Sequence, residues 1–365
     1  MLYFTDMDFL LQISIAVLSG YLSFTNTLAL EIEKLLPVHM APEKEYAKVS
    51  TRNTLVHIES KSRFGTIPDI LIQNAEYQKA AVVESIDPED APATALEALV
   101  NIFCTYKTDT YIKSTTGTGF FIDTSGVILT NAHVAQFLLL EGIVGDAECI
   151  IRNGNPATDM YHAELLYISP TWVLEHAKLI NDATPKGTGE RDYALLYVTS
   201  GIEKEPMPKE FAALPFDTTL MNTRAVDDDV FATGYPAESM LAQSIKSPLI
   251  PKQATTTISE LMTFGSNFVD VFTIRGTSIG EHGSSGGPVV NKEGKVLGMI
   301  STKGDDTQFG DGSLRAISLS YIDRTITEET TFSLRQNLNG NLPFKAKIFK
   351  DTMVPFLQKI IKEEL

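Results

Sequence analysis

The sequence has few cysteines and fewer basic than acidic residues. Two cysteines in 365 residues, Cys104 and Cys149, cannot form a zinc site by themselves. An even count of this kind suggests one disulfide in an exported chain and two buried thiols in a cytosolic chain. The formal net charge is −16, from 46 acidic and 30 basic residues. This balance argues against a general nucleic-acid-binding protein, whose affinity would come from basic patches that meet phosphates.

The sequence also lacks internal repeats and metal-binding patterns. No segment recurs with a period of 20–50 residues, so an architecture of stacked repeats is not indicated. The acidic runs at 227–229 and 305–306 are typical of solvated turns, and we expect no metal ion and no cofactor. Hydrophobic residues make up 43% and charged residues 21% of the chain, which is ordinary for a globular protein. The length suffices for one large or two medium domains with hydrophobic cores.

An apolar segment at residues 9–30 forms the first distinct part of the chain. Its hydrophobic core, residues 9–18, is followed by small and polar residues. Thr27 and Ala29 would satisfy the small-residue demand of signal peptidase, with cleavage after Ala29. No Lys or Arg precedes the core, and the whole segment is nearly long enough to span a membrane, so a membrane anchor is the close alternative. A buried N-terminal helix of the domain is a third interpretation.

These alternatives determine the expected localisation. A signal peptide or an outward-facing anchor predicts an extracytoplasmic protein, which is secreted, periplasmic or membrane-anchored. The positive-inside rule leaves a cytosolic orientation open, because the segment has no preceding basic residue. Residues 31–93 contain recurring prolines and end in the linker-like stretch IDPEDAPA. They are interpreted as a spacer, a pro-segment or a small accessory element.

Residues 283–288, GSSGGP, form the stretch that is most informative about chemistry. A serine enclosed by glycines on a tight turn is what a nucleophilic hydroxyl needs, because glycines permit positive φ and let a substrate backbone approach. Consecutive backbone N–H groups of such a turn can also point into one concavity and hold an oxyanion. The alternative is a Gly/Ser-rich hairpin loop without chemistry, so the motif needs partners elsewhere in the chain.

Two further segments supply such partners. The block TGTGFFIDTSGVILT at 116–130 is typical of a β-hairpin, and NAHVA with His133 follows at once. Asp192 opens the apolar stretch DYALL. Taken singly, His133 could be a core histidine bonded to the backbone, and Asp192 could be a charge at a strand edge. Their order along the chain is histidine, then aspartate, then serine. This order favours a catalytic role for both residues over these alternatives.

In these three segments the sequence resembles the trypsin/chymotrypsin-like serine peptidases, in particular the bacterial HtrA/Deg type. The resemblance covers about residues 94–325. It implies a peptidase domain at 94–330, with two halves that meet near 205–225, and a C-terminal helical tail at 331–365. The residues that follow Ser285 are too few for both the second half and the PDZ domain that HtrA/Deg proteins usually carry.

The density of short apolar runs predicts an all-β fold of two Greek-key β-barrels, as the resemblance also implies. Strands of the first barrel are expected at 100–105, 116–121, 127–130, 148–152, 163–168 and 193–198. Those of the second are expected at 229–234, 253–262, 268–274, 288–290, 296–301 and 315–320. A helical insertion is expected at 172–180 and a polar linker after about 325. The segment 344–365 has apolar residues at helical spacing and is expected to pack on a barrel.

The resemblance assigns roles to individual residues. Ser285 would be the nucleophile, His133 the general base and then acid, and Asp192 the group that fixes the imidazole tautomer. The backbone N–H groups of Gly283 and Ser285 would form the oxyanion hole. Three more residues would bind substrate: Ser301 on the strand that pairs with the substrate backbone, Ile279 at the base of the specificity pocket, and His282 near its mouth.

The resemblance also has implications for specificity, for activation and for the two cysteines. An apolar Ile279 predicts a preference for small or medium apolar side chains over Lys and Arg. Ser284 stands where digestive peptidases have an aspartate that pairs with a freed N-terminus, so that route of activation is not available. Cys104 and Cys149 would lie on two strands of the first barrel. A disulfide between them is a hypothesis, and it would contribute about 3–4 kcal/mol on the chain-entropy account.

These observations predict a serine endopeptidase that hydrolyses peptide bonds through an acyl-enzyme. Its partners would be polypeptide substrates and no nucleic acid, with possible membrane association through residues 9–30. Two alternatives remain from the sequence: a non-catalytic peptide-binding module on the same fold, and a latent peptidase that needs an activator. The oligomeric state is left open.

Overall fold

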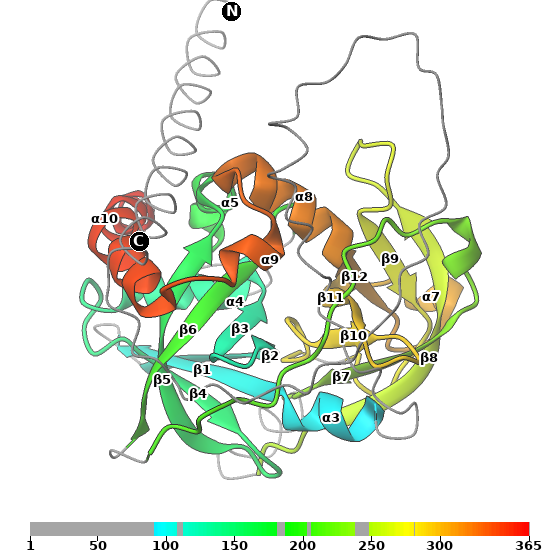
Figure 1. Cartoon of the computed structure of the whole chain (residues 1–365), viewed down its shortest axis with the longest axis horizontal. Helices are drawn as coiled ribbons and strands as arrows, with labels where there is room; N and C mark the ends of the chain where they lie inside the picture. Colours follow the sequence, from blue (N-terminus) through cyan, green and yellow to red (C-terminus); the bar gives the residue numbers. More distant parts are fainter. Residues whose placement is uncertain are drawn as a thin grey trace, which may run out of the picture. The chain divides into compact units, whose positions relative to one another are not determined.

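The computed structural model describes residues 91–107, 112–180, 187–202, 206–237, 248–280 and 282–364, all of which belong to one compact unit. The expected N-terminal segment 1–30 and residues 31–90 of the following segment lie outside this described part. Within the described residues, twelve β-strands form two closed antiparallel barrels, and helices follow the second barrel (Figure 1). This is the all-β fold of two barrels with a C-terminal helix that the sequence predicts.

The first barrel closes in the order β1-β2-β3-β6-β5-β4. Asp123 accepts a hydrogen bond from the Ser125 N–H at 2.9 Å in the β2–β3 turn, and Gly126, at a φ of 94°, completes this turn. The hairpin therefore forms where its Asp/Ser/Gly turn residues predicted it. The six strands are β1 (Leu99–Lys107), β2 (Ile112–Asp123), β3 (Val127–Thr130), β4 (Glu148–Asn153), β5 (Thr158–Ile168) and β6 (Ala194–Gly201).

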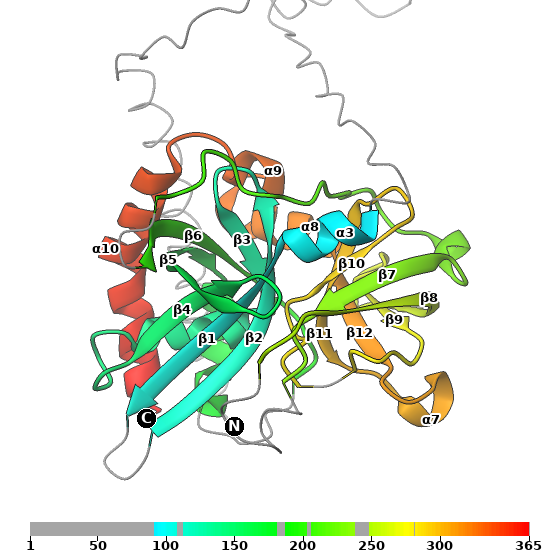
Figure 2. The same cartoon turned by 90° about the horizontal axis from the view of Figure 1, so that it is seen from below.

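The second barrel closes in the order β10-β11-β12-β9-β8-β7 and lies beside the first (Figure 2). Its interior is apolar, since Val230, Phe272, Val289 and Ile300 are almost completely buried. Burial of such side chains is the main force that closes the sheet on itself. The six strands are β7 (Asp229–Gly234), β8 (Lys252–Met262), β9 (Val271–Ile274), β10 (Pro288–Val290), β11 (Val296–Lys303) and β12 (Leu314–Ser318).

Two expectations for the end of the second barrel are wrong. The strand expected at 315–320 stops at Ser318, whose hydroxyl accepts the Tyr321 N–H at 3.2 Å and caps helix α8 (Leu319–Thr330). The expected polar linker after 325 is therefore helical, and α9 (Leu334–Asn337) follows it. Ile322 and Ile326 are fully buried on α8, so these two apolar residues, spaced four positions apart, place one face of the helix against the fold.

Helix α10 (Leu342–Lys362) covers the first barrel, as expected for the C-terminal segment. It contacts β5, β6 and helix α5 (Pro170–His176), which forms the expected insertion. A row of residues four positions apart is buried in this contact: Phe349, Met353, Leu357 and Ile361. The row places one face of the helix against the barrel. None of the helices in the described ranges has the length and apolar character needed to cross a membrane.

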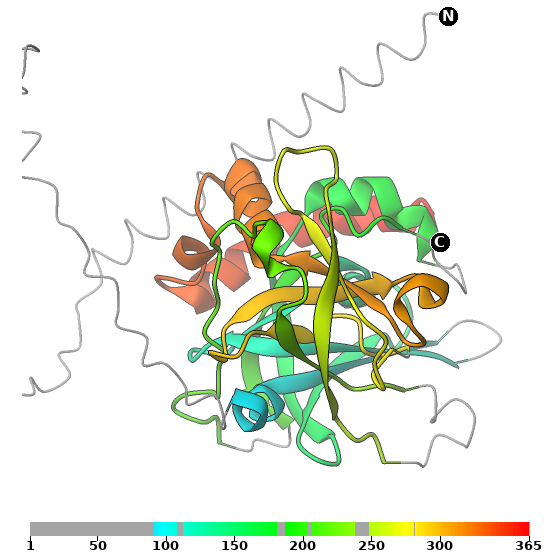
Figure 3. The same cartoon turned by 90° about the vertical axis from the view of Figure 1, so that its right-hand side faces the viewer.

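The other helices are short, and all of them except α3, which precedes β1, lie between strands. They are α3 (Ala91–Glu97), α4 (Ala132–Ala135), α7 (Asp306–Phe309) and the 3₁₀ turns η1 (Gln136–Leu140), η2 (Ala177–Leu179) and η4 (Thr223–Ala225). Helix α3 lies on the opposite side of the barrels from α5 and α8 (Figure 3). It starts inside the linker-like stretch IDPEDAPA, which therefore ends in a helix.

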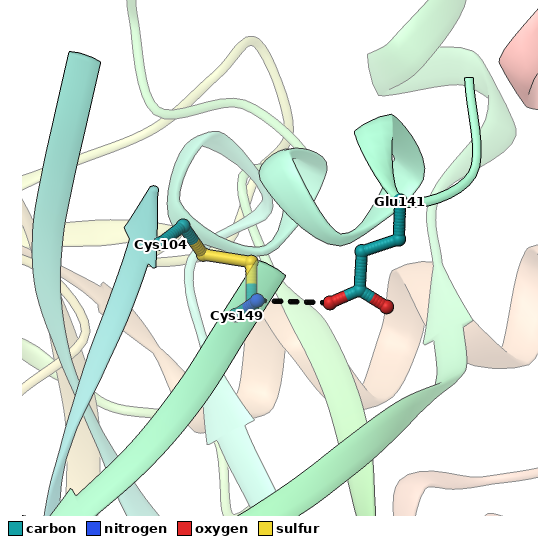
Figure 4. The surroundings of a disulfide bond; sticks show 3 residues. All are labelled: Cys104, Glu141 and Cys149. Atoms are coloured by element: carbon teal, nitrogen blue, oxygen red, sulfur yellow. Dashed lines mark hydrogen bonds between the residues drawn. A yellow bond between two sulfur atoms is a disulfide. The ribbon is translucent and has the colours of Figure 1, made fainter. Parts of the chain in front are cut away.

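A disulfide joins Cys104 and Cys149, with an S–S distance of 2.05 Å (Figure 4). The two residues lie directly opposite each other on the paired strands β1 and β4. The Cys149 N–H donates a hydrogen bond of 2.9 Å to the carboxylate of Glu141. Burial raises the pKa of Glu141 above its ordinary value. The disulfide thus links two strands that the barrel already pairs.

Candidate active site

The carboxylate of Asp192 accepts three hydrogen bonds at the junction of the two barrels. Its Oδ1 accepts the backbone N–H of His133 at 2.9 Å, and its Oδ2 accepts the ring Nδ1–H of His133 at 2.8 Å. Oδ2 also accepts the hydroxyl of Ser301, from β11 of the second barrel, at 2.8 Å. Asp192 is 3% exposed, so these donors replace the water that a buried carboxylate has lost.

His133 lies on the short helix α4, directly after β3. The Asn131 side chain donates to the backbone carbonyl of Asp192 at 3.0 Å, and the Gln136 side chain donates to the carbonyl of His133 at 2.9 Å. The Asn131 bond fixes the helix relative to the segment that carries Asp192, and the Gln136 bond closes the end of the helix. Because Nδ1 faces a carboxylate, the ring proton of neutral His133 belongs on Nδ1, which leaves the Nε2 lone pair for a proton transfer. The His133 side chain is 32% exposed.

The pKa values of both groups shift in the direction that this pairing requires. Burial alone would lower the pKa of His133, but the charge of Asp192 and its hydrogen bond outweigh burial and raise that pKa above 6.5. Burial alone would raise the pKa of Asp192. The charge of His133 and the hydrogen bonds from His133 and Ser301 lower it below 3.8. Asp192 is therefore ionised at neutral pH and stabilises a proton on the imidazole.

The turn at 283–287 needs glycine for steric as well as conformational reasons. Gly283 and Gly286 have φ values of 98° and 90°, in the region that favours glycine. A Cβ at Gly286 would lie 1.9 Å from the carbonyl oxygen of Thr118, and a Cβ at Gly283 would lie 2.5 Å from the carbonyl oxygen of Tyr235. The turn is therefore packed directly against β2 of the first barrel and against the residue that follows β7 of the second.

Ser285 joins the Asp192 group through Ser301. The Ser285 hydroxyl donates to the carbonyl oxygen of Ser301 at 3.3 Å, while the Ser301 hydroxyl reaches Asp192. The turn is held to β11 by bonds of 2.8 Å from the Gly286 N–H to the Ile300 carbonyl and from the Ile300 N–H back to the turn. The structure thus brings together Ser285, His133, Asp192 and Ser301, which lie in four separate segments of the sequence.

The backbone N–H groups of Gly283 and Ser285 are expected to hold an oxyanion. Neither of them donates a hydrogen bond to a backbone carbonyl among the described residues. The carbonyl of His282 accepts the Ala237 N–H at 2.7 Å. In a trans peptide the C=O and N–H point in opposite directions, so the Gly283 N–H faces away from Ala237. The Ser285 N–H shares its peptide group with the Ser284 carbonyl, which accepts the Gly287 N–H at 3.0 Å. By the same argument, the Ser285 N–H faces away from Gly287.

Ile279, which is expected at the base of the specificity pocket, does not line a pocket in the structure. Ile279 is fully buried and packs in the core cluster of the second barrel, so its side chain presents no surface to a substrate in this structure. Ser284 is also fully buried, and its hydroxyl donates to the Ile279 carbonyl at 2.6 Å. The hydroxyl thereby stabilises the loop that leads into the turn. His282 is exposed beside the turn.

Two residues that hold these groups in place are not indicated by the sequence pattern. Thr118 is completely buried on β2 and bonds to the turn that carries Ser285. Glu329 on α8 is 5% exposed and accepts hydrogen bonds from Arg191, Ser169 and the Tyr167 hydroxyl. Thr118 stands between the two glycines of TGTGFF, and this pattern is only a weak indication of its role. Glu329 lies in a polar stretch that gives no local sign of burial.

A protein-family model identifies the class of the chain. The trypsin-like peptidase domain family matches residues 117–299, half of the chain, and this range contains His133, Asp192 and Ser285. The chain therefore belongs to the trypsin-like peptidases. No curated protein is found to match the chain.

Two crystal structures of the Rv3671c protease are similar to this chain. The active form, from M. tuberculosis, is 20% identical, with a TM-score of 0.41, and the match covers 76% of this chain and 96% of that one. The inactive form is 19% identical, with a TM-score of 0.40, and the match covers 67% of this chain and 95% of that one.

Proposed function

We propose that the protein is a serine endopeptidase that acts through Ser285, His133 and Asp192. One observation carries the proposal: Asp192 binds His133 Nδ1 and the Ser301 hydroxyl at 2.8 Å each, while Ser285 contacts the same Ser301. This connected group lies in a chain of the trypsin-like peptidase family. A buried, ionised carboxylate that orients an imidazole is what a weak serine nucleophile needs for activation.

The reaction would proceed by acyl transfer. When a peptide binds, the Ser285 hydroxyl turns from the Ser301 carbonyl toward His133 Nε2, gives up its proton there, and its oxygen attacks the scissile carbonyl carbon. The carbonyl oxygen becomes an oxyanion, which the N–H groups of Gly283 and Ser285 stabilise. His133 then donates the proton to the leaving amine as the C–N bond breaks. A water molecule, deprotonated by His133, hydrolyses the resulting ester and restores Ser285.

The proposed substrates are polypeptides whose backbone pairs along β11 beside Ser301. We also propose a preference for small or medium apolar side chains. This preference is supported by the resemblance alone, since Ile279 is enclosed by the barrel core. Profiling a peptide library with the active protein tests it, and a strong preference for Lys or Arg would contradict it.

We propose further that the protein is of the HtrA/Deg type and acts outside the cytoplasm. The proposed organisation is a signal peptide or membrane anchor at 1–30, a linker or pro-segment at 31–93, the peptidase domain at 94–330 and the helical tail at 331–365. The Cys104–Cys149 disulfide supports an oxidising compartment. Fractionation of cells that express the full-length chain tests the localisation, and recovery in the cytosol would contradict it.

Labelling with a fluorophosphonate tests the catalytic proposal. We expect the full-length chain to be labelled at Ser285, and the variants Ser285→Ala and His133→Ala to remain unlabelled. The wild type, but not these variants, should also cleave unfolded, fluorescently labelled casein. Absence of both reactions in the wild type would overturn the proposal and favour a non-catalytic peptide-binding module. Activity that appears only after a partner or a peptide ligand is added would identify a latent peptidase.

A further inference from the structure

We propose that the hydroxyl of Thr118, on the first barrel, is a positioning group for the oxyanion hole on the second. The hydroxyl donates a hydrogen bond of 2.6 Å to the carbonyl oxygen of Gly283 and accepts one of 3.0 Å from the N–H of Tyr235. It therefore ties Gly283 to the neighbouring segment of the second barrel. This inference deepens the proposed peptidase function and rests on it.

All polar groups of Thr118 are engaged at this one place. Its N–H donates to the carbonyl of Ser285 at 2.8 Å, and its own carbonyl accepts the Thr130 hydroxyl at 2.7 Å. The residue is 0% exposed, so none of these groups has water as an alternative partner. Such a fully used polar residue fixes the position of the elements it joins.

The four consecutive carbonyls from His282 to Ser285 each accept a hydrogen bond. The carbonyls of His282, Ser284 and Ser285 accept the backbone N–H groups of Ala237, Gly287 and Thr118 respectively. The carbonyl of Gly283 is the member of this series held by a side chain. Its bond is therefore the one that a substitution can remove without altering the backbone.

The orientation of the Gly283 carbonyl bears on catalysis because glycine has a soft backbone. Gly283 sits at a φ of 98°, and without a Cβ it could rotate into other conformations at little cost. Rotation about this residue would change the angle between the N–H groups of Gly283 and Ser285. Oxyanion stabilisation depends on donors that are fixed before the charge develops. The Thr118 hydroxyl supplies that restraint from across the barrel junction.

The substitution Thr118→Val removes the hydroxyl and preserves the shape of the side chain. We expect kcat to fall about 10- to 100-fold, which does not exceed the loss that deletion of an oxyanion donor causes. KM should change less than about threefold. The substrate is a fluorogenic peptide taken from a casein site that the wild type cleaves. Thr118→Ser keeps the hydroxyl and should restore most of kcat.

Two binding measurements separate positioning from general structural damage. A peptide boronic acid of the same sequence mimics the tetrahedral state and should bind Thr118→Val about 10- to 100-fold more weakly. The uncleaved peptide should bind Ser285→Ala and Thr118→Val/Ser285→Ala with the same Kd. Thr273→Val is the matched control. It removes a fully buried hydroxyl that has no hydrogen-bond partner in the described part of the chain, and we expect wild-type kinetics.

The proposal is overturned if Thr118→Val keeps wild-type kcat and boronate affinity, or if Thr118→Ser is as impaired as Thr118→Val. Should Thr118→Val fail to fold, Thr118→Ala and Thr118→Ser are compared in the same assays, and equal kcat values in these two variants would also overturn it. These outcomes presuppose an active wild type. An inactive wild type would instead contradict the peptidase function itself.

Discussion

The guanidinium of Arg191 binds the carboxylate of Glu329 at 2.7 Å, and this bond connects helix α8 to the residue directly before Asp192. Glu329 is buried and also accepts the Tyr167 hydroxyl, whose pKa is raised by burial and by the charge of Glu329. Arg191 adopts a φ of 54°, which is uncommon for a residue with a Cβ. The ion pair therefore fixes a strained segment that presents Asp192 to His133.

Removing the Glu329 charge should destabilise the fold. Glu329→Gln leaves the partly buried Arg191 without its buried counter-charge, and we expect a loss of about 2–4 kcal/mol in the free energy of unfolding. Glu328→Gln is the matched control, since Glu328 contacts the same guanidinium at 3.3 Å but is 60% exposed. It should cost less than about 0.5 kcal/mol. Denaturant titration measures both, and equal losses would contradict the role of burial.

The pH profile of kcat/KM should report the pairing of His133 with Asp192. His133 must be neutral to accept a proton, so activity falls as pH decreases through its pKa. Because that pKa is raised above 6.5, the acid limb should have its midpoint above 6.5. Asp192→Asn should move the midpoint down and reduce kcat by about 10⁴. His162→Gln, which alters a histidine outside the site, should leave the limb in place. A wild-type midpoint below 6.5 would show that the pairing is absent.

Stability at acid pH should depend on Asp192. Its folded-state pKa lies below 3.8, so it contributes stability that is complete above the unfolded pKa and is lost as pH falls through the folded pKa. Unfolding free energies measured from about pH 4 downward should therefore decrease more steeply in the wild type than in Asp192→Asn. Parallel curves for the two proteins would argue against a depressed pKa.

Loss of the disulfide should lower stability without removing the fold of the barrel. The chain between Cys104 and Cys149 spans 45 residues, and the Cys104→Ser/Cys149→Ser variant should lose about 3–4 kcal/mol. Intact-mass analysis with and without reductant establishes the bond in the wild type. Reductant should lower the melting temperature of the wild type and leave that of the double variant unchanged. A wild type insensitive to reductant would contradict this contribution.

A methyl group at Gly286 should disrupt the turn that carries Ser285. Its Cβ would lie 1.9 Å from the Thr118 carbonyl, so Gly286→Ala should reduce kcat/KM at least about 100-fold, as expected when the nucleophile is displaced by about 1 Å. Gly142→Ala is the control, because Gly142 also has positive φ but its added methyl group would have nothing within 4 Å. It should cost only backbone strain of about 1–2 kcal/mol and leave kcat/KM unchanged. Comparable kinetics of the two variants would contradict the steric argument.

The barrel fold could be predicted because short apolar runs alternate with turn residues along most of the chain. The sequence of β7, DVFATG, shows this directly, and its predicted bounds coincide with those in the structure. The failure at 319–330 has a physical cause. Helix α8 combines few apolar residues with buried Ser320, Thr325 and Glu329, and its stability comes from contacts made across the fold rather than from its own pattern.

Candidate site residues could be named where each lies in a distinctive local segment, as His133 does in NAHVA. Thr118 and Glu329 could not be named, because their roles depend on contacts with residues more than 130 positions away, Gly283 and Arg191. Ile279 shows that a residue named from the sequence can also be misplaced. Its position in the chain resembles that of a pocket residue, yet the direction of its side chain is decided by packing inside the second barrel.

The return of helices α8 and α10 to the first barrel has a consequence for synthesis. Helix α10 buries its apolar row against β5 and β6, and α8 supplies the carboxylate that binds Arg191. The strands of the first barrel leave the ribosome early, but their outer cover and this ion pair come from segments that are made after the whole second barrel. A chain still in synthesis therefore has a first barrel without its outer cover, and the ion pair beside Asp192 forms only once α8 has emerged.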